Sequence, residues 1–76
     1  MRIKKNSYII LKYLSHYDDN ALVKNDEVYT QINISEDSFA KAAAICSAFG
    51  FTDGSKTHIG ITAKGRLYLQ ELEENL

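Results

Sequence analysis

The chain has 76 residues, of which 45% are hydrophobic and 25% charged, and a formal net charge of −1. Such a length indicates one small globular domain over residues 1–76, which buries only about 60% of the surface that its unfolded chain exposes. A single cysteine, Cys46, excludes an intrachain disulfide and a zinc site built from several thiolates. We find no signal peptide and no membrane-spanning stretch in the sequence, and therefore expect a cytoplasmic protein without membrane contact.

The charges fall into blocks along the chain. Residues 1–17 hold four basic side chains and no acid, whereas residues 18–37 hold six acids and one lysine. Residues 38–66 hold four basic side chains and one acid, and the remaining residues carry three glutamates. In a small fold such blocks produce opposed faces or an ordinary solvated surface, and both interpretations stay open.

The first half of the chain predicts two helices with a short strand between them. Ile10, Leu11 and Leu14 recur at helical spacing and indicate a first helix from about Ser7 to Tyr17.

A break at residues 18–20 follows, and residues 21–23 are apolar enough for a short strand. Asn25 is the expected N-cap of a second helix of about two turns, since Asp26 and Glu27 then lie where the helix dipole favours acids.

The clearest helix start in the sequence is Ser35, with two acids directly after it. Gly50 is expected to end this third helix in a left-handed conformation. Five apolar residues recur along the helix and are expected to face the core: Phe39, Ala42, Ala43, Cys46 and Phe49.

A β-hairpin is predicted next, because the Asp-Gly pair in the turn 53–56 separates two short strands, residues 51–52 and 57–62. Thr62 then caps a last helix whose apolar stripe includes Leu69 and Leu72. The sequence therefore predicts a mainly α chain with a small antiparallel hairpin, an α+β fold in the order helix, short strand, helix, helix, hairpin, helix.

This order of elements and three local sequence segments resemble the winged helix-turn-helix superfamily, in particular small YjcQ-like phage and prophage proteins and, more distantly, PadR-like and MarR-like transcriptional regulators. The segments that carry the resemblance are Ile34-Ser-Glu-Asp-Ser-Phe39, Phe49-Gly50-Phe51 and Ile61-Thr-Ala-Lys-Gly-Arg-Leu-Tyr-Leu69. In DNA-binding members of such families the second helix of the motif lies in the major groove and the hairpin, or wing, contacts the backbone. The resemblance thus implies a groove helix at residues 36–49 and a wing tip at residues 53–57.

The function that the resemblance implies is a small DNA-binding regulator of duplex DNA. Ser38 and Lys41 would then contact groove edges, Lys56 a phosphate at the wing, and Lys64 and Arg66 phosphates beside the last helix. The alternative is a winged-helix module that binds a protein through the alanine-rich face of the third helix, because one fold serves both functions.

So few lysines neutralise only a few phosphates, and DNA binding therefore calls for a dimer or a partner. Ile9 and Leu67 fall on the outer faces of the first and last helices and are the candidate dimer residues. Isolated exposed aliphatic residues are also common on monomers, so this alternative stays open.

Enzymatic chemistry, a metal and a cofactor are not expected. His16 and His58 have no ligand-spaced partner, and Cys46 falls in the core stripe of its helix. Phe49 and Phe51 are likewise expected in the core, so the sequence predicts no aromatic platform for stacking bases.

Overall fold

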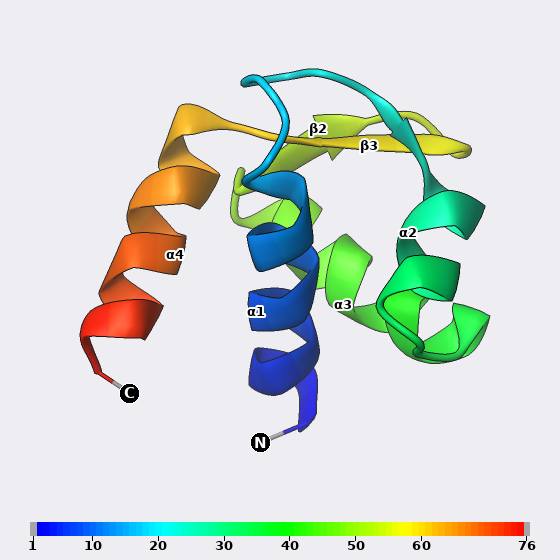
Figure 1. Cartoon of the computed structure of the whole chain (residues 1–76), viewed down its shortest axis with the longest axis horizontal. Helices are drawn as coiled ribbons and strands as arrows, with labels where there is room; N and C mark the ends of the chain where they lie inside the picture. Colours follow the sequence, from blue (N-terminus) through cyan, green and yellow to red (C-terminus); the bar gives the residue numbers. More distant parts are fainter. Residues whose placement is uncertain (1, 76) are drawn as a thin grey trace.

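Four helices and a three-stranded sheet make up residues 2–75, the part of the chain that the computed structural model describes. In chain order they are α1 (Arg2–Leu14), β1 (Val23–Lys24), α2 (Asn25–Gln31), α3 (Glu36–Ala48), β2 (Thr52–Gly54), β3 (His58–Ile61) and α4 (Ala63–Glu74). The sheet lies across one end of the helices, and α1 begins and α4 ends away from it (Figure 1). The predicted α+β class and the order of elements are confirmed.

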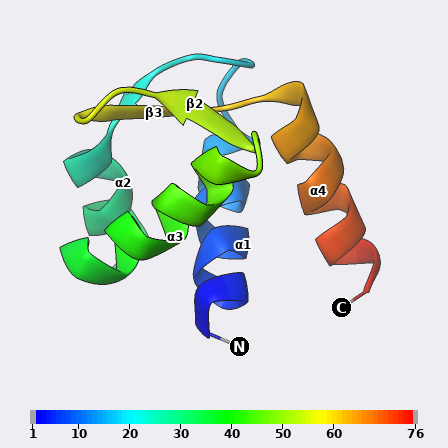
Figure 2. The ribbon, with the colours of Figure 1, turned by 180° about the vertical axis from the view of Figure 1, so that it is seen from behind.

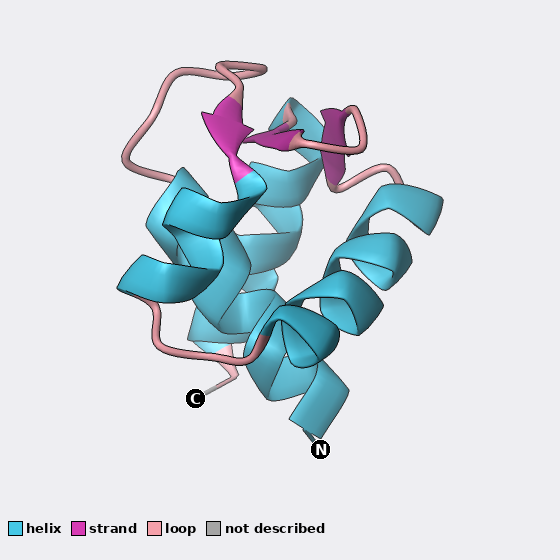
Figure 3. Ribbon diagram, turned by 90° about the vertical axis from the view of Figure 1, so that its right-hand side faces the viewer, coloured by secondary structure: helices cyan, strands magenta, loops and turns pink. Residues whose placement is uncertain are grey.

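β3 is the central strand and pairs antiparallel with both neighbours, in the order β1-β3-β2. Val23 lies opposite Ile59 on one side, and Thr52 lies opposite Ile61 on the other. Figure 3 shows the strands together at one end of the helices. The strand predicted at residues 21–23 exists, but it begins two residues later and ends one residue later than expected.

The core lies where α1, α3, α4 and the inner face of the sheet meet. α3 crosses α1, as Figure 2 shows from behind. The contacts between them bury Ile10 and Leu14 of α1 and Cys46 of α3 completely. Further buried hydrophobic residues come from these two helices and from α2, β3 and α4. They include Leu11, Val28, Phe39, Ala42, Ile59, Ile61, Leu69 and Leu72.

The bounds of α1 differ from the prediction at both ends. The helix begins before Ser7, whose side chain is buried. It ends at Leu14 because the N–H groups of His16 and Tyr17 bond three residues back instead of four, which tightens the last turn. The predicted apolar face of the helix is confirmed.

Asn25 is not the N-cap of α2, contrary to the prediction. The cap position is Lys24, which makes no side-chain cap bond. Asn25 is the first helical residue, and its side-chain amide donates to the carbonyl of Lys56 over 2.9 Å while its N–H donates to Thr57 over 2.9 Å. The hairpin therefore orients the Asn25 side chain, and its amide oxygen, the atom that would accept the cap bond, has no hydrogen-bond partner among the described residues.

Both predicted ends of α3 are confirmed. The hydroxyl of Ser35 accepts a hydrogen bond from the N–H of Ser38 over 3.1 Å. At the other end Gly50 has a φ of 78°, its N–H donates to Ser47, and the next N–H, of Phe51, donates to Cys46. These two bonds are the Schellman arrangement, which a residue without a Cβ adopts at low cost.

Phe49 does not belong to the core, and this prediction was wrong. Its side chain is 59% exposed, whereas Phe39 and Cys46 are buried. At 100° per residue, Phe49 lies about 80° around the helix from Phe39, beyond the buried face. The spacing i+10 was too generous a criterion for a residue at the end of a helix.

The hairpin and the start of α4 follow the predicted pattern with a shifted turn. Asp53 and Gly54 pair within the sheet, so the connection is residues 55–57 and not 53–56. Thr62 caps α4 as expected by accepting the N–H of Gly65 over 3.0 Å.

Candidate nucleic-acid interface

α3 presents a solvent face of small side chains with one lysine. Ala40, Ala44 and Ser47 are exposed on it, and Lys41 extends from its middle. The ammonium of Lys41 lies 3.4 Å from the carboxylate of Asp37, one turn earlier, and both side chains are largely exposed. An exposed pair of this kind is weak, so Lys41 can exchange Asp37 for another anion at little cost.

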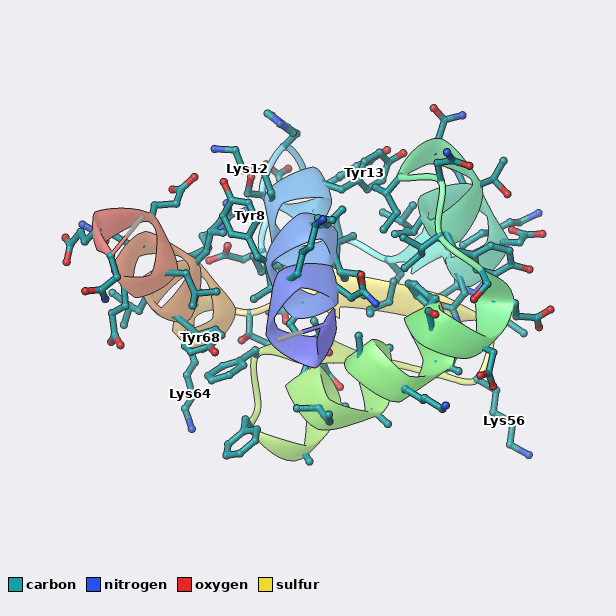
Figure 4. All side chains as sticks on the ribbon, turned by 90° about the horizontal axis from the view of Figure 1, so that it is seen from below. Tyr8, Lys12, Tyr13, Lys56, Lys64 and Tyr68 are labelled. Carbon is teal, nitrogen blue, oxygen red and sulfur yellow. The ribbon has the colours of Figure 1, made fainter. Side chains whose placement is uncertain are left out.

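Two further lysines lie beyond the two ends of this helix. Lys56 belongs to the hairpin connection and Lys64 to the first turn of α4, and both are exposed. Figure 4 shows the two side chains on the side of the molecule that α3 occupies, whereas Lys12 lies on the opposite side. The fold thus brings Lys41, Lys56 and Lys64 to one side, although 23 residues separate the first from the last.

The other two predicted DNA-binding residues do not extend toward this side in the same way. Ser38 is partly buried, and its N–H is used by the helix cap. Arg66 donates from each of its three nitrogens to a protein oxygen: the carboxylate of Asp19, the carbonyl of Tyr17 and, over 2.9 Å, the carbonyl of Ser15. The guanidinium therefore fastens α4 to the end of α1, where the helix dipole favours a cation.

A groove of about 780 Å³ runs between α3 and the hairpin. Its α3 wall consists of small side chains that include Ala40, Ala43 and Ala44. Charged groups on its rim are of both signs: Lys24 and Lys56, against Asp26, Glu36 and Asp53. The groove therefore carries charges of both signs, with one acid more than it has lysines.

Three aromatic rings form a surface cluster that the sequence did not predict. The rings of Phe51 and Tyr68 stack with centroids 4.1 Å apart and planes 7° from parallel. The ring of Phe49 stacks on that of Phe51, with centroids 5.7 Å apart and planes 15° from parallel. The ammonium of Lys64 lies 5.8 Å from the centroid of Phe51. The signal in the sequence is the Phe49-Gly50-Phe51 segment, whose glycine turns the chain so that both rings lie together.

The two candidate dimer residues differ in exposure. Leu67 is 62% exposed on α4, whereas Ile9 on α1 is partly buried. Leu67 is therefore available to a partner surface, and Ile9 contributes less area to one.

Two clusters of titratable groups are structural in character. The hydrogen bond between the hydroxyls of Tyr13 and Tyr17, burial and the nearby carboxylate of Glu27 raise the pKa of Tyr13 well above its ordinary value of 10.0. Burial raises the pKa of the Cys46 thiol, although a hydrogen bond from Ser7 opposes the shift. A nucleophilic cysteine needs the opposite shift and access to solvent. In residues 2–75 the His, Cys, Asp and Glu side chains nowhere gather in threes that could hold a metal ion.

Comparison of the chain with protein-family models, with curated proteins and with solved structures found no match. Each helix within residues 2–75 is too short or too polar to cross a membrane.

Proposed function

We propose that this protein is a winged helix-turn-helix protein that binds duplex DNA, a small regulator of phage or prophage type. In this proposal α2 and α3 are the helix-turn-helix, α3 lies in the major groove, and the β2–β3 hairpin is the wing. The proposal is supported by the order of the elements and by the three-stranded sheet, in which β1 pairs with β3 of the hairpin. It draws equally on the resemblance of the segments around Ser35, Gly50 and Gly65 to that superfamily.

The observation that carries the proposal is the exposed Lys41 on α3 together with Lys56 and Lys64, which lie on the side of the molecule that α3 occupies (Figure 4). A helix of 13 residues is about 20 Å long. The major groove is about 12 Å wide, so cations beyond both ends of α3 reach phosphates on the two strands that border it. Exposed Ala40 and Ala44 between them let the helix backbone approach the bases closely.

The side chains favour phosphate contacts over base readout. Lys41 is the single long cationic side chain on the solvent face of α3, while Glu36 and Asp37 begin the helix. Three phosphate contacts give a salt slope of only about 3 for one copy of the chain, since each contributes about 0.9. A two-fold dimer doubles that number, and exposed Leu67 with Ile9 is the proposed contact.

A polarisation titration with random-sequence duplex at low salt, followed by a salt series, tests the function. The wild type should bind with an affinity that falls steeply with salt, and Lys41→Glu with Lys56→Glu should abolish binding. The matched control is Lys4→Glu with Lys5→Glu, which changes the net charge equally on α1 and should retain more of the affinity. Equal losses in the two double variants would show that net charge, not the α3 side, governs binding.

The oligomeric state is tested separately by sedimentation of the wild type and an Ile9→Asp, Leu67→Asp variant. We expect a dimer for the wild type and a monomer for the variant. A monomeric mass for both would reject this interface without affecting the DNA titration.

A protein-binding module is the second candidate, and the groove between α3 and the hairpin favours it. Its alanine wall and its acidic groups, Asp26, Glu36 and Asp53, suit a segment with small apolar and basic side chains better than a phosphate backbone. Absence of duplex binding even at low salt would favour this candidate over the first.

A further inference from the structure

We propose that Phe49 and Lys64 form a stacking site for an unpaired nucleobase, so that the protein prefers a duplex that ends in a single strand to a blunt one. This inference rests on the proposed function and names the form of nucleic acid that the α3 side takes. It arises where the core prediction for Phe49 was wrong.

The ring of Phe49 is exposed but not free to move at random. Phe49 is the C-cap residue of α3, and the two Schellman hydrogen bonds of the next two residues fix the backbone there. Phe51 packs beside its ring, and Phe51 is in turn stacked on Tyr68. A ring that is held in place on one side and 59% exposed offers a π surface with little entropy left to lose on binding.

A cation lies beside Gly50, the residue that follows Phe49, and over the ring of Phe51, on which Phe49 stacks. A Cβ atom at Gly50 would lie 3.6 Å from Cδ and 3.9 Å from Nζ of Lys64, so the lysine runs along the residue that follows Phe49. The same ammonium lies over the ring of Phe51. Ring and ammonium together match a base and its adjacent phosphate, the pair that single-strand binding sites recognise. A purely hydrophobic partner would leave the ammonium unused.

The position of this site decides which base it takes. Phe49 lies at the C-terminal end of α3, directly after the helix that the proposal places in the major groove. Bases inside a duplex are stacked on one another and offer no free face. A base beyond the end of the duplex, or one flipped out of it, can reach the ring while Lys41 and Lys56 hold the paired part.

The experiment compares a blunt duplex with the same duplex carrying a short single-stranded extension, in polarisation titrations at one salt concentration. Base–aromatic stacking predicts roughly tenfold tighter binding of the extended probe by the wild type. Phe49→Leu should remove that preference and leave the affinity for the blunt duplex unchanged, whereas Phe49→Trp should keep it. Leu22→Ala, which also shortens an exposed hydrophobic side chain, is the control and should keep the preference. A 2-aminopurine in the extension should be quenched on binding to the wild type and not to Phe49→Leu.

The outcomes separate this inference from the function on which it rests. Equal affinity for the two probes, or a preference that survives in Phe49→Leu, overturns the stacking site and leaves duplex binding intact. Binding of neither probe overturns both. Binding of the extended probe alone, lost in Phe49→Leu, supports the stacking site and overturns duplex recognition. A lower sedimentation mass of Phe49→Leu than of the wild type would instead assign the ring to a contact between copies of the chain.

Discussion

The hydroxyl of Thr62 donates a hydrogen bond to the carbonyl oxygen of Gly50 over 2.7 Å. The same hydroxyl accepts the N–H of Gly65, and the N–H of Thr62 donates to the carbonyl of Phe51 over 3.1 Å. One residue thereby joins the end of α3 to the start of α4 across the sheet. These contacts fix Lys64 and Phe49 relative to each other, which the proposed stacking site requires.

Replacement of Thr62 by valine keeps the shape of the side chain and removes both of its hydrogen bonds. We expect a loss of about 1–2 kcal/mol in the free energy of unfolding, measured by urea denaturation, because a helix cap and a bond to a carbonyl disappear together. Thr62→Ser should retain most of the stability. Thr30→Val on the exposed side of α2 is the control, and a loss there as large as at Thr62 would contradict this account.

Gly65 allows α4 to approach the chain before the hairpin. A Cβ at this position would lie 2.1 Å from the carbonyl oxygen of Phe51 and 3.0 Å from the Ile61 side chain. Gly65→Ala should therefore destabilise the protein by about 1–3 kcal/mol, as overpacking does, although the same change in an open helix stabilises by about 1 kcal/mol. Thermal unfolding by circular dichroism measures the sign, and a raised Tm would reject the close approach.

The contacts of Arg66 predict a cost for any replacement that lacks its three-sided donor geometry. Arg66→Met should lose on the order of 2 kcal/mol, since hydrogen bonds from a charged group to Ser15 and Tyr17 disappear and leave their carbonyls unpaired. Arg66→Lys should recover only part of the loss, because one ammonium cannot serve the same set of oxygens. If the lysine variant were as stable as the wild type in denaturant titrations, the charge alone would explain the role of Arg66.

A pH dependence follows from the ion pair between Lys12 of α1 and Glu73 of α4, whose atoms lie 2.8 Å apart. The hydrogen bond and the charge of Lys12 lower the pKa of Glu73 below its ordinary 4.5, and Glu73 raises the pKa of Lys12 above 10.5. A carboxyl group whose pKa is lowered in the folded state stabilises the fold at pH values above its ordinary pKa. This stabilisation is lost as the pH falls through the pKa of the folded state. The lysine contributes below 10.5 and loses its effect as the pH rises through its own folded value.

Carboxyl NMR titration checks this prediction. The pKa of Glu73 should move back toward 4.5 in Lys12→Met and stay lowered in Lys5→Met, which removes a charge from the same helix. Because both groups are on the surface, salt should weaken the shift in the wild type. A pKa of Glu73 that is the same in all three proteins would remove the ion pair as its cause.

The sequence determined the local features whose cause lies within a few residues. Ser35 and Thr62 cap helices because a hydroxyl can reach an N–H three residues on, and Gly50 ends α3 because it lacks a Cβ. The apolar stripe of Ile10, Leu11 and Leu14 could be predicted as well, since residues on one face of a helix recur with a fixed period. These features need no information from distant parts of the chain, so the α+β class and the element order could be predicted.

The tertiary structure decided what depends on contacts across the chain. The side chain of Asn25 bonds the hairpin and does not cap α2, and Arg66 bonds the end of α1, because a polar group bonds the partner that is nearest in space. Phe49 lies outside the core because it is turned about 80° around the helix from Phe39, beyond the face of α3 that is buried. The grouping of Lys41, Lys56 and Lys64 on one side likewise exists only after the hairpin packs beside α3, since no periodicity along the sequence links three separate elements.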